Sequence, residues 1–143
     1  MPSPIRTSVV LLSVATIACT TKYEPLTGPR VVTPLGLEQT VRLSPAEPAP
    51  GDTLIIASVV MNGTSLPVDV TSRICGIDVE TTLKLTGTNV ACAGYSMHGE
   101  LAPGDSLLGS AMGVVASAPG TYNLRVRHLL NPDVWVEVPI TVR

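Results

Sequence analysis

Apolar and polar residues alternate with a period of two along most of the chain after residue 40. In the last stretch, Val134 and every second residue to Val142 are apolar. The residues between them, which are Trp135, Glu137, Pro139 and Thr141, form the opposite face. The stretch from Ile77 to Leu85 alternates in the same way. A period of two places successive side chains on opposite faces of a β-strand and excludes an amphipathic helix. Pro139 cannot donate a ladder hydrogen bond, so the last strand is predicted to lie at a sheet edge or to carry a bulge.

Turn signals divide this region into short strands. Residues 53–61 form an almost continuous apolar run, which predicts a strand buried on both faces or in a sandwich core. Strands ending at turns roughly every 8–12 residues are typical of an antiparallel sandwich. The turn segments are Pro48–Asp52, Asn62–Gly63, Ala102–Asp105, Ala118–Gly120 and Asn131–Asp133. We therefore predict an all-β sandwich of seven or eight strands over residues 40–143, with an aliphatic core because the chain has no Phe and one Trp.

The first 18 residues have the order of a secretory signal peptide. Arg6 precedes an uncharged run from Thr7 to Ile17, and the small residue Ala18 follows. The run is about half of the roughly 20 residues that a transmembrane helix needs. A buried core helix is the alternative, but the domain pattern begins much later. The segment 1–18 is therefore predicted to direct export.

Residues 19–39 contain three prolines and no clean periodicity. A short segment of this composition is typical of a flexible spacer. The alternative is a first strand through Val31 and Val32. We predict a tether that separates the domain from its point of attachment.

The residues Thr16-Ile17-Ala18-Cys19 resemble the lipobox of bacterial lipoproteins. The resemblance implies that Cys19 is acylated, becomes the mature N-terminus and anchors the protein in a membrane. Ordinary secretory cleavage, with Cys19 left as a thiol, is the alternative. Thr20 in place of aspartate implies, by the same resemblance, delivery to the outer membrane facing the periplasm. In a host with a single membrane, the protein would lie at the cell surface.

Two cysteines remain if Cys19 carries lipid. Cys75 and Cys92 would then form an even pair in an oxidising compartment, where disulfides persist. The alternative is two buried free thiols. A metal site is not indicated, because no CxxC spacing or histidine cluster accompanies the cysteines.

Charge and titratable residues indicate neither nucleic-acid binding nor catalysis. Without residues 1–18 the chain has eight basic residues, one fewer than the whole chain, against 11 acidic residues, a net charge of −3 with no basic stripe. His128 shares the parity of core positions, which predicts a half-buried structural histidine, and His98 lies in a loop beside Glu100. Asp78 and Glu80 could bind a cation, although a solvated strand face explains them better. We predict no enzyme and no cofactor.

Three turns resemble those of bacterial immunoglobulin-like domains. They are Gly51-Asp52-Thr53-Leu54, Leu101-Ala102-Pro103-Gly104-Asp105-Ser106 and Ala118-Pro119-Gly120-Thr121-Tyr122. Their spacing is similar to that of the intracellular proteinase inhibitor family. The resemblance covers residues 41–143, and residues 72–97 depart from it. It implies an immunoglobulin-like sandwich in which Tyr122 ties a corner to nearby backbone.

Trp135 faces away from the valine side of the last strand. It is predicted either to anchor an envelope protein partner or to pack beneath the tether. We therefore expect a lipid-anchored envelope protein with a non-catalytic binding or scaffolding domain. The alternative is a proteinase inhibitor that acts through an exposed loop at residues 86–97.

Overall fold

The computed structural model describes residues 28–33, 35–70, 76–92 and 99–143, and this part of the chain is built of antiparallel strands. The ten strands are β1 (Arg30–Val32), β2 (Leu37–Ser44), β3 (Thr53–Asn62), β4 (Val68–Asp69), β5 (Ile77–Thr81), β6 (Leu85–Cys92), β7 (Glu100–Leu101), β8 (Ser106–Val115), β9 (Gly120–His128) and β10 (Trp135–Val142). Among these residues, no helix is long and apolar enough to cross a membrane. The all-β prediction is confirmed.

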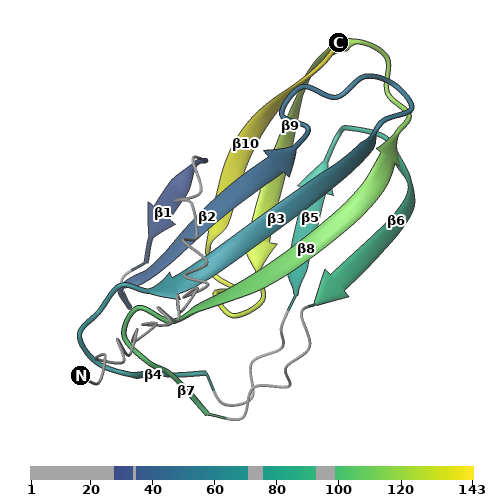
Figure 1. Cartoon of the computed structure of the whole chain (residues 1–143). Coiled ribbons are helices and arrows are strands. Elements are labelled where there is room, and N and C mark those ends of the chain that lie inside the picture. The colour runs from purple at the N-terminus through teal and green to yellow at the C-terminus, as the bar shows by residue number, and fades with distance from the viewer. Residues whose placement is uncertain (1–27, 34, 71–75, 93–98) are drawn as a thin grey trace, which may run out of the picture.

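Two sheets form the two layers of the domain (Figure 1). One sheet has five strands in the order β1-β2-β3-β8-β6, and the other has three in the order β10-β9-β5. The two-residue strands β4 and β7 pair separately at one end. The described residues thus form more strands than the seven or eight predicted, and the additional ones are the short strands β1, β4 and β7.

An aliphatic core joins the two layers. Every second residue of β10, from Val136 to Val142, is buried against inward residues of the five-stranded sheet such as Leu54 and Ile56. A second buried cluster around Leu37 and Leu130 lies outside this main core. Fully burying side chains of this kind contributes about 1.5–3 kcal/mol each. The core contains no aromatic side chain among its buried members, as the composition predicted.

The stretch 77–85 is two strands rather than one. The chain leaves β5 at Thr81 and crosses from the three-stranded to the five-stranded sheet before β6 begins. Local hydrogen bonds fix the crossing: the Leu83 amide donates to the Thr81 hydroxyl at 3.0 Å, and the Lys84 amide donates to the Ser117 hydroxyl at 2.8 Å. Alternation persists through the crossing, because Leu83 still enters the core. A pattern of period two cannot distinguish one strand from two that share a core.

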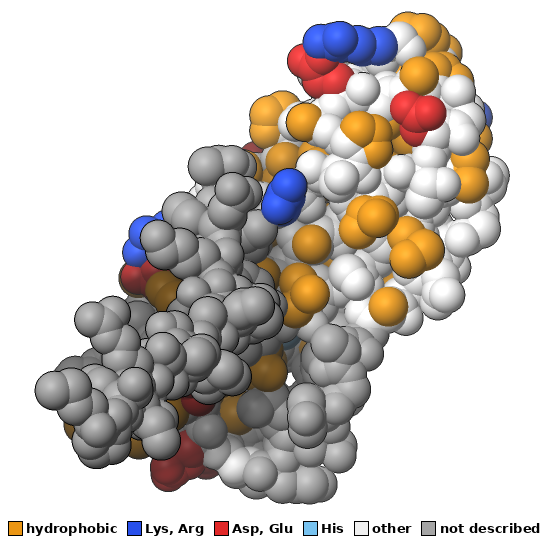
Figure 2. All heavy atoms as spheres, in the orientation of Figure 1, with side chains coloured by type: hydrophobic (Ala, Val, Ile, Leu, Met, Phe, Trp, Pro, Cys, Tyr) orange, Lys and Arg blue, Asp and Glu red, His pale blue; other side chains and the backbone are white. Residues whose placement is uncertain are grey.

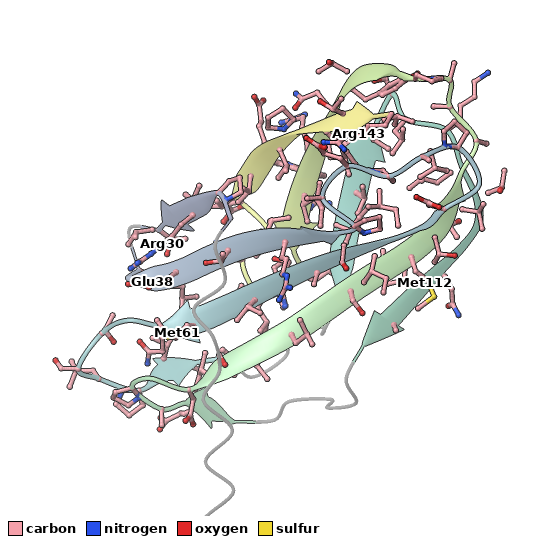
Figure 3. The ribbon with its side chains drawn as sticks, turned by 45° about the horizontal axis from the view of Figure 1, so that its top comes forward. Arg30, Glu38, Met61, Met112 and Arg143 are labelled. Atoms are coloured by element: carbon pink, nitrogen blue, oxygen red, sulfur yellow. The ribbon has the colours of Figure 1, made fainter. Side chains whose placement is uncertain are left out.

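The five-stranded sheet begins earlier than the domain boundary predicted at residue 40. Strand β1 pairs with β2, with Arg30 opposite Thr40, and β2 itself begins at Leu37. The structure therefore has the first strand that the sequence offered as the alternative to a tether over residues 31–32. Figure 3 shows Arg30 and Glu38 directed toward one another across β1 and β2, where they form an ion pair.

Two finer predictions are confirmed. Strand β10 pairs only with β9 among the described residues, so Pro139 lies on an edge strand. The Tyr122 hydroxyl donates to the Ala118 carbonyl oxygen at 2.8 Å, which ties the corner before β9 to the strand. For residues 53–61, the structure has the second of the two predicted alternatives, a strand in a sandwich core: β3 buries one face, with Leu54 and Ile56 in the core, and Ile55 on its other face is exposed.

Candidate binding surfaces

Several predicted site residues lie outside the described part of the chain. These are Cys19, Cys75 and His98. Cys92 is the last residue of β6, and its backbone lies opposite Gly109 of β8. Gly76, the neighbour of Cys75 in sequence, approaches the same glycine closely: a Cβ on Gly109 would lie 3.0 Å from the Gly76 carbonyl carbon. The backbone next to Cys75 and the backbone of Cys92 therefore meet at one glycine.

The outer face of the three-stranded sheet carries two rows of charged residues. In one row Arg125 of β9 forms an ion pair with Glu80 of β5 at 2.8 Å and lies 3.8 Å from Glu137 of β10. In the next row Arg127 forms an ion pair with Asp78. The two acids that the sequence offered as a cation site are thus each paired with an arginine. Cross-strand pairs of opposite charge stabilise a sheet by about 0.2–1 kcal/mol each.

Trp135 lies on this same face and is half-buried. The guanidinium carbons of Arg125 and Arg127 lie 5.0 and 4.6 Å from its ring centroid. Both distances are within the range of a cation–π interaction. Much of the contact surface that was predicted for a partner is therefore occupied by the protein's own arginines.

Replacing Trp135 with alanine is expected to lower the free energy of unfolding by about 1–2 kcal/mol, because two cation–π contacts are lost at about 0.5–1 kcal/mol each. Urea unfolding measures the loss. Trp135→Phe is the matched control, because it keeps a ring between the two guanidinium groups and should recover part of the difference. Unchanged stability of Trp135→Ala would contradict this structural role and favour the partner contact.

An apolar groove of about 350 Å³ opens between β5 and β6, where the two sheets separate at one side of the domain. Its walls include Ile77 and Val79 from β5, Leu85 and Val90 from β6, and Ala111 from β8. Val90 is 58% exposed. Within the described residues, β5 pairs only with β9 and β6 only with β8, so both walls present a free strand edge. Free edges flanked by apolar side chains can accept an added extended segment.

The loop that was predicted for proteinase inhibition is largely a strand. Residues 86–92 belong to β6 and pair with β8, with a bulge between Thr86 and Asn89. Gly87 has a φ of 64° within this bulge, a conformation that glycine adopts readily. Residues 93–97 of the predicted loop lie outside the described part of the chain. The described part of the predicted loop is therefore strand.

His128 is fully buried at the end of β9, rather than half-buried as predicted. Its Nδ1 accepts a hydrogen bond from the Leu130 amide at 3.1 Å. Within the described residues its Nε2 has no hydrogen-bond partner. Desolvation by burial lowers the pKa of His128 from 6.5 to about 4. A neutral imidazole is therefore part of the buried structure at physiological pH.

The groove and the outer faces of the sheets are the binding surfaces that the described residues offer. No group of three or more His, Cys, Asp or Glu side chains that could hold a metal ion occurs among them. No known family model and no curated protein matches the sequence.

Proposed function

We propose that this chain is a lipid-anchored protein of the bacterial cell envelope whose immunoglobulin-like sandwich is a non-catalytic binding or scaffolding domain. The order of Arg6, the apolar run, Ala18 and Cys19 supports export and lipidation. The attachment places the domain at the outer membrane facing the periplasm, or at the surface of a host with one membrane. At least two acyl chains give stable anchoring.

The strand order supports the immunoglobulin-like part of the proposal. Strands β2, β3, β8 and β6 are neighbours in one sheet, and β5, β9 and β10 in the other. Numbered along these seven strands as A to G, the sheets are ABED and CFG, which is the constant-type arrangement. The hydrogen bond from Tyr122 to Ala118 at the start of β9, which is strand F, corresponds to the corner that such domains use.

The groove between β5 and β6 is the observation that carries the binding role. It combines a mixed lining, apolar except for Asp78, Thr81 and Thr88, with two free strand edges at the open side of the sandwich. Main-chain hydrogen bonds to such an edge supply affinity, and the apolar positions select alternate side chains of the bound segment. An extended segment of an envelope protein is the partner that this geometry fits.

The full chain tests the proposal in its own membrane. The intact mass of the extracted protein should correspond to a chain that starts at Cys19 with added acyl groups, and Cys19→Ala should leave the membrane fraction. A photo-crosslinking residue at Val90 should then give a discrete adduct with an envelope protein identified by its mass. The matched control is Leu66, which is 70% exposed and does not line the groove.

Two results would count against the proposal. A soluble chain without lipid would remove the anchor. Equal adducts from Val90 and Leu66, or none from Val90, would remove the groove as the binding site.

A further inference from the structure

The outer face of the five-stranded sheet has an uncharged apolar surface that the proposed function leaves unexplained. Outward positions on β3, β8 and β6 carry no Asp, Glu, Lys, Arg or His, and we call this surface the uncharged face. Figure 2 shows apolar side chains gathered over β3 and β8 with uncharged atoms between them. The positions are Thr53, Ile55, Ala57, Val59 and Met61 on β3, Ser106, Leu108, Ser110, Met112 and Val114 on β8, and Thr86, Asn89 and Ala91 on β6.

The large side chains on the uncharged face are substantially exposed. Ile55 is 40% exposed, and Leu108, Met112 and Val114 are between 37% and 38% exposed. At about 3.3 Å per residue, the ten-residue strands β3 and β8 are each about 30 Å long. An uncharged surface of this length, on which apolar side chains outnumber Ser, Thr and Asn, indicates an interaction surface on a water-exposed domain.

The N-terminal segment joins this sheet at its β1 edge, about halfway along the length of the strands. The Pro29 carbonyl oxygen accepts a hydrogen bond from the Val41 amide at 3.2 Å, and Gly28 packs so closely on the Val41 carbonyl that a side chain there would collide with it. Val41 lies opposite Ser58, halfway along β3. A tether that joins halfway along one edge of the sheet, rather than at a tip of the domain, lets the domain lie on its side.

Even when fully extended, the tether is no longer than the uncharged face. If Cys19 is the anchor, eight residues separate it from Gly28. A chain of this length reaches about 30 Å when fully extended, and about 16 Å on average when flexible. The uncharged face therefore stays within one domain length of the bilayer, where a high effective concentration favours even weak association.

Charge distribution favours the same orientation. The three acids Asp78, Glu80 and Glu137 lie on the outer face of the opposite sheet. Arg42, in contrast, is exposed on the five-stranded sheet, in the row of Ala57 and Ser110. Arg125 and Arg127 lie among these three acids, so that face has a net charge of −1. On the five-stranded sheet, Arg30 and Arg42 outnumber Glu38. A bilayer with anionic headgroups therefore attracts the five-stranded sheet more than the opposite face.

We propose that the uncharged face lies flat against the lipid bilayer in which Cys19 is anchored, with Trp135 and the charged rows turned to the aqueous side. This inference rests on the lipid anchor of the proposed function. Burial of apolar side chains at the headgroup boundary supplies the attraction, and Arg42 contacts phosphate groups. The groove between β5 and β6 then remains open at the side of the domain.

Tryptophan quenching by brominated lipids tests the orientation, because the single native tryptophan lies on the far sheet and serves as the internal control. The lipidated protein is reconstituted into phosphatidylethanolamine–phosphatidylglycerol vesicles with brominated acyl chains. Met112→Trp and Met61→Trp, each with Trp135→Tyr, place a reporter at opposite ends of the uncharged face (Figure 3). We expect bromine to reduce both reporters' emission roughly two-fold, since interfacial side chains lie about 5–10 Å into the boundary. Trp135 in the unaltered chain should keep its emission.

Each other outcome overturns the inference. Quenching at one methionine position only would show a domain that stands on its end. Blue-shifted emission without quenching would show that a second copy or a protein partner covers the face, and quenching of Trp135 would reverse the orientation.

Intact mass separates these results from failure of the anchor. Lipidated protein with unquenched reporters overturns the orientation alone, whereas unlipidated protein overturns both proposals. Urea unfolding of each variant checks that it is folded.

Discussion

Replacing Cys75 and Cys92 with serine is expected to lower the free energy of unfolding of the oxidised protein by about 3 kcal/mol, which is the chain-entropy value for closing a loop of about 15 residues. The loop between them is of this length. The cross-link acts mainly on the unfolded chain, whose freedom it restricts. For a domain of about 100 residues, 3 kcal/mol is a large share of a typical stability of 5–15 kcal/mol.

Gly76, which follows Cys75 in the sequence, and the backbone of Cys92 both lie beside Gly109. Gly109 accommodates the close approach of Gly76, and it is also the residue opposite Cys92. Any side chain at Gly109 would separate the two sheets here, since its Cβ would lie 2.8 Å from Cγ2 of Ile77. The two sheets therefore come close together at Gly109, beside Gly76 and the backbone of Cys92. The proposed disulfide would close the end of the groove between β5 and β6.

Urea unfolding of the full chain with and without dithiothreitol measures the effect. Reductant should lower the stability of the native sequence by about the amount of the double substitution, and it should leave the serine variant unchanged. The variant is its own control, because any destabilisation by serine itself persists when reductant is present. Equal stability of the native protein with and without reductant would show that the two thiols are free.

The sequence predicted the layers of the fold better than their connections. Alternation identified the strands because one face of each strand enters an aliphatic core. The burial of that face is recorded in the strand's own sequence, without reference to its neighbours. The passage from β5 to β6 was missed, because Leu83 keeps the alternation while the chain changes sheets. The strand at Arg30–Val32 was left as an alternative, because three residues on a sheet edge bury too little to produce a clear pattern.

The surfaces were harder to predict than the core. The continuous apolar run of β3 left two alternatives open, a strand buried on both faces or one in a sandwich core, and the structure has the second, with Ile55 and its alternate neighbours facing outward. The same run, together with the uncharged sequence of β8, was the available signal for the uncharged face. The groove had no signal in the sequence, since it depends on which strands become sheet edges. Trp135 was correctly placed on the outer side, but the two arginines that cover it come from a strand paired with its own.

His128 is expected to make the domain lose stability as the pH falls below neutrality. Burial lowers the pKa of His128 to about 4 in the folded protein, against 6.5 for a solvent-exposed histidine, so protons bind the unfolded chain more tightly. The stabilising effect of the neutral form is therefore complete above pH 6.5 and is lost as the pH falls toward 4. The linkage between proton binding and folding lowers the free energy of unfolding by about 2 kcal/mol at pH 5, and by about 3 kcal/mol once the pH is well below 4. The Leu130 amide adds a second reason, because protonation of Nδ1 would remove its acceptor.

Urea unfolding at pH 7.5 and pH 5 measures this loss, and His128→Gln is the matched variant. Glutamine keeps a polar side chain of similar size at this position but does not titrate, so its stability should change much less between the two pH values. A change in packing affects the variant at both pH values, so only the difference in stability between the two pH values reports the proton. Parallel pH profiles for the two proteins would show that His128 does not control acid stability.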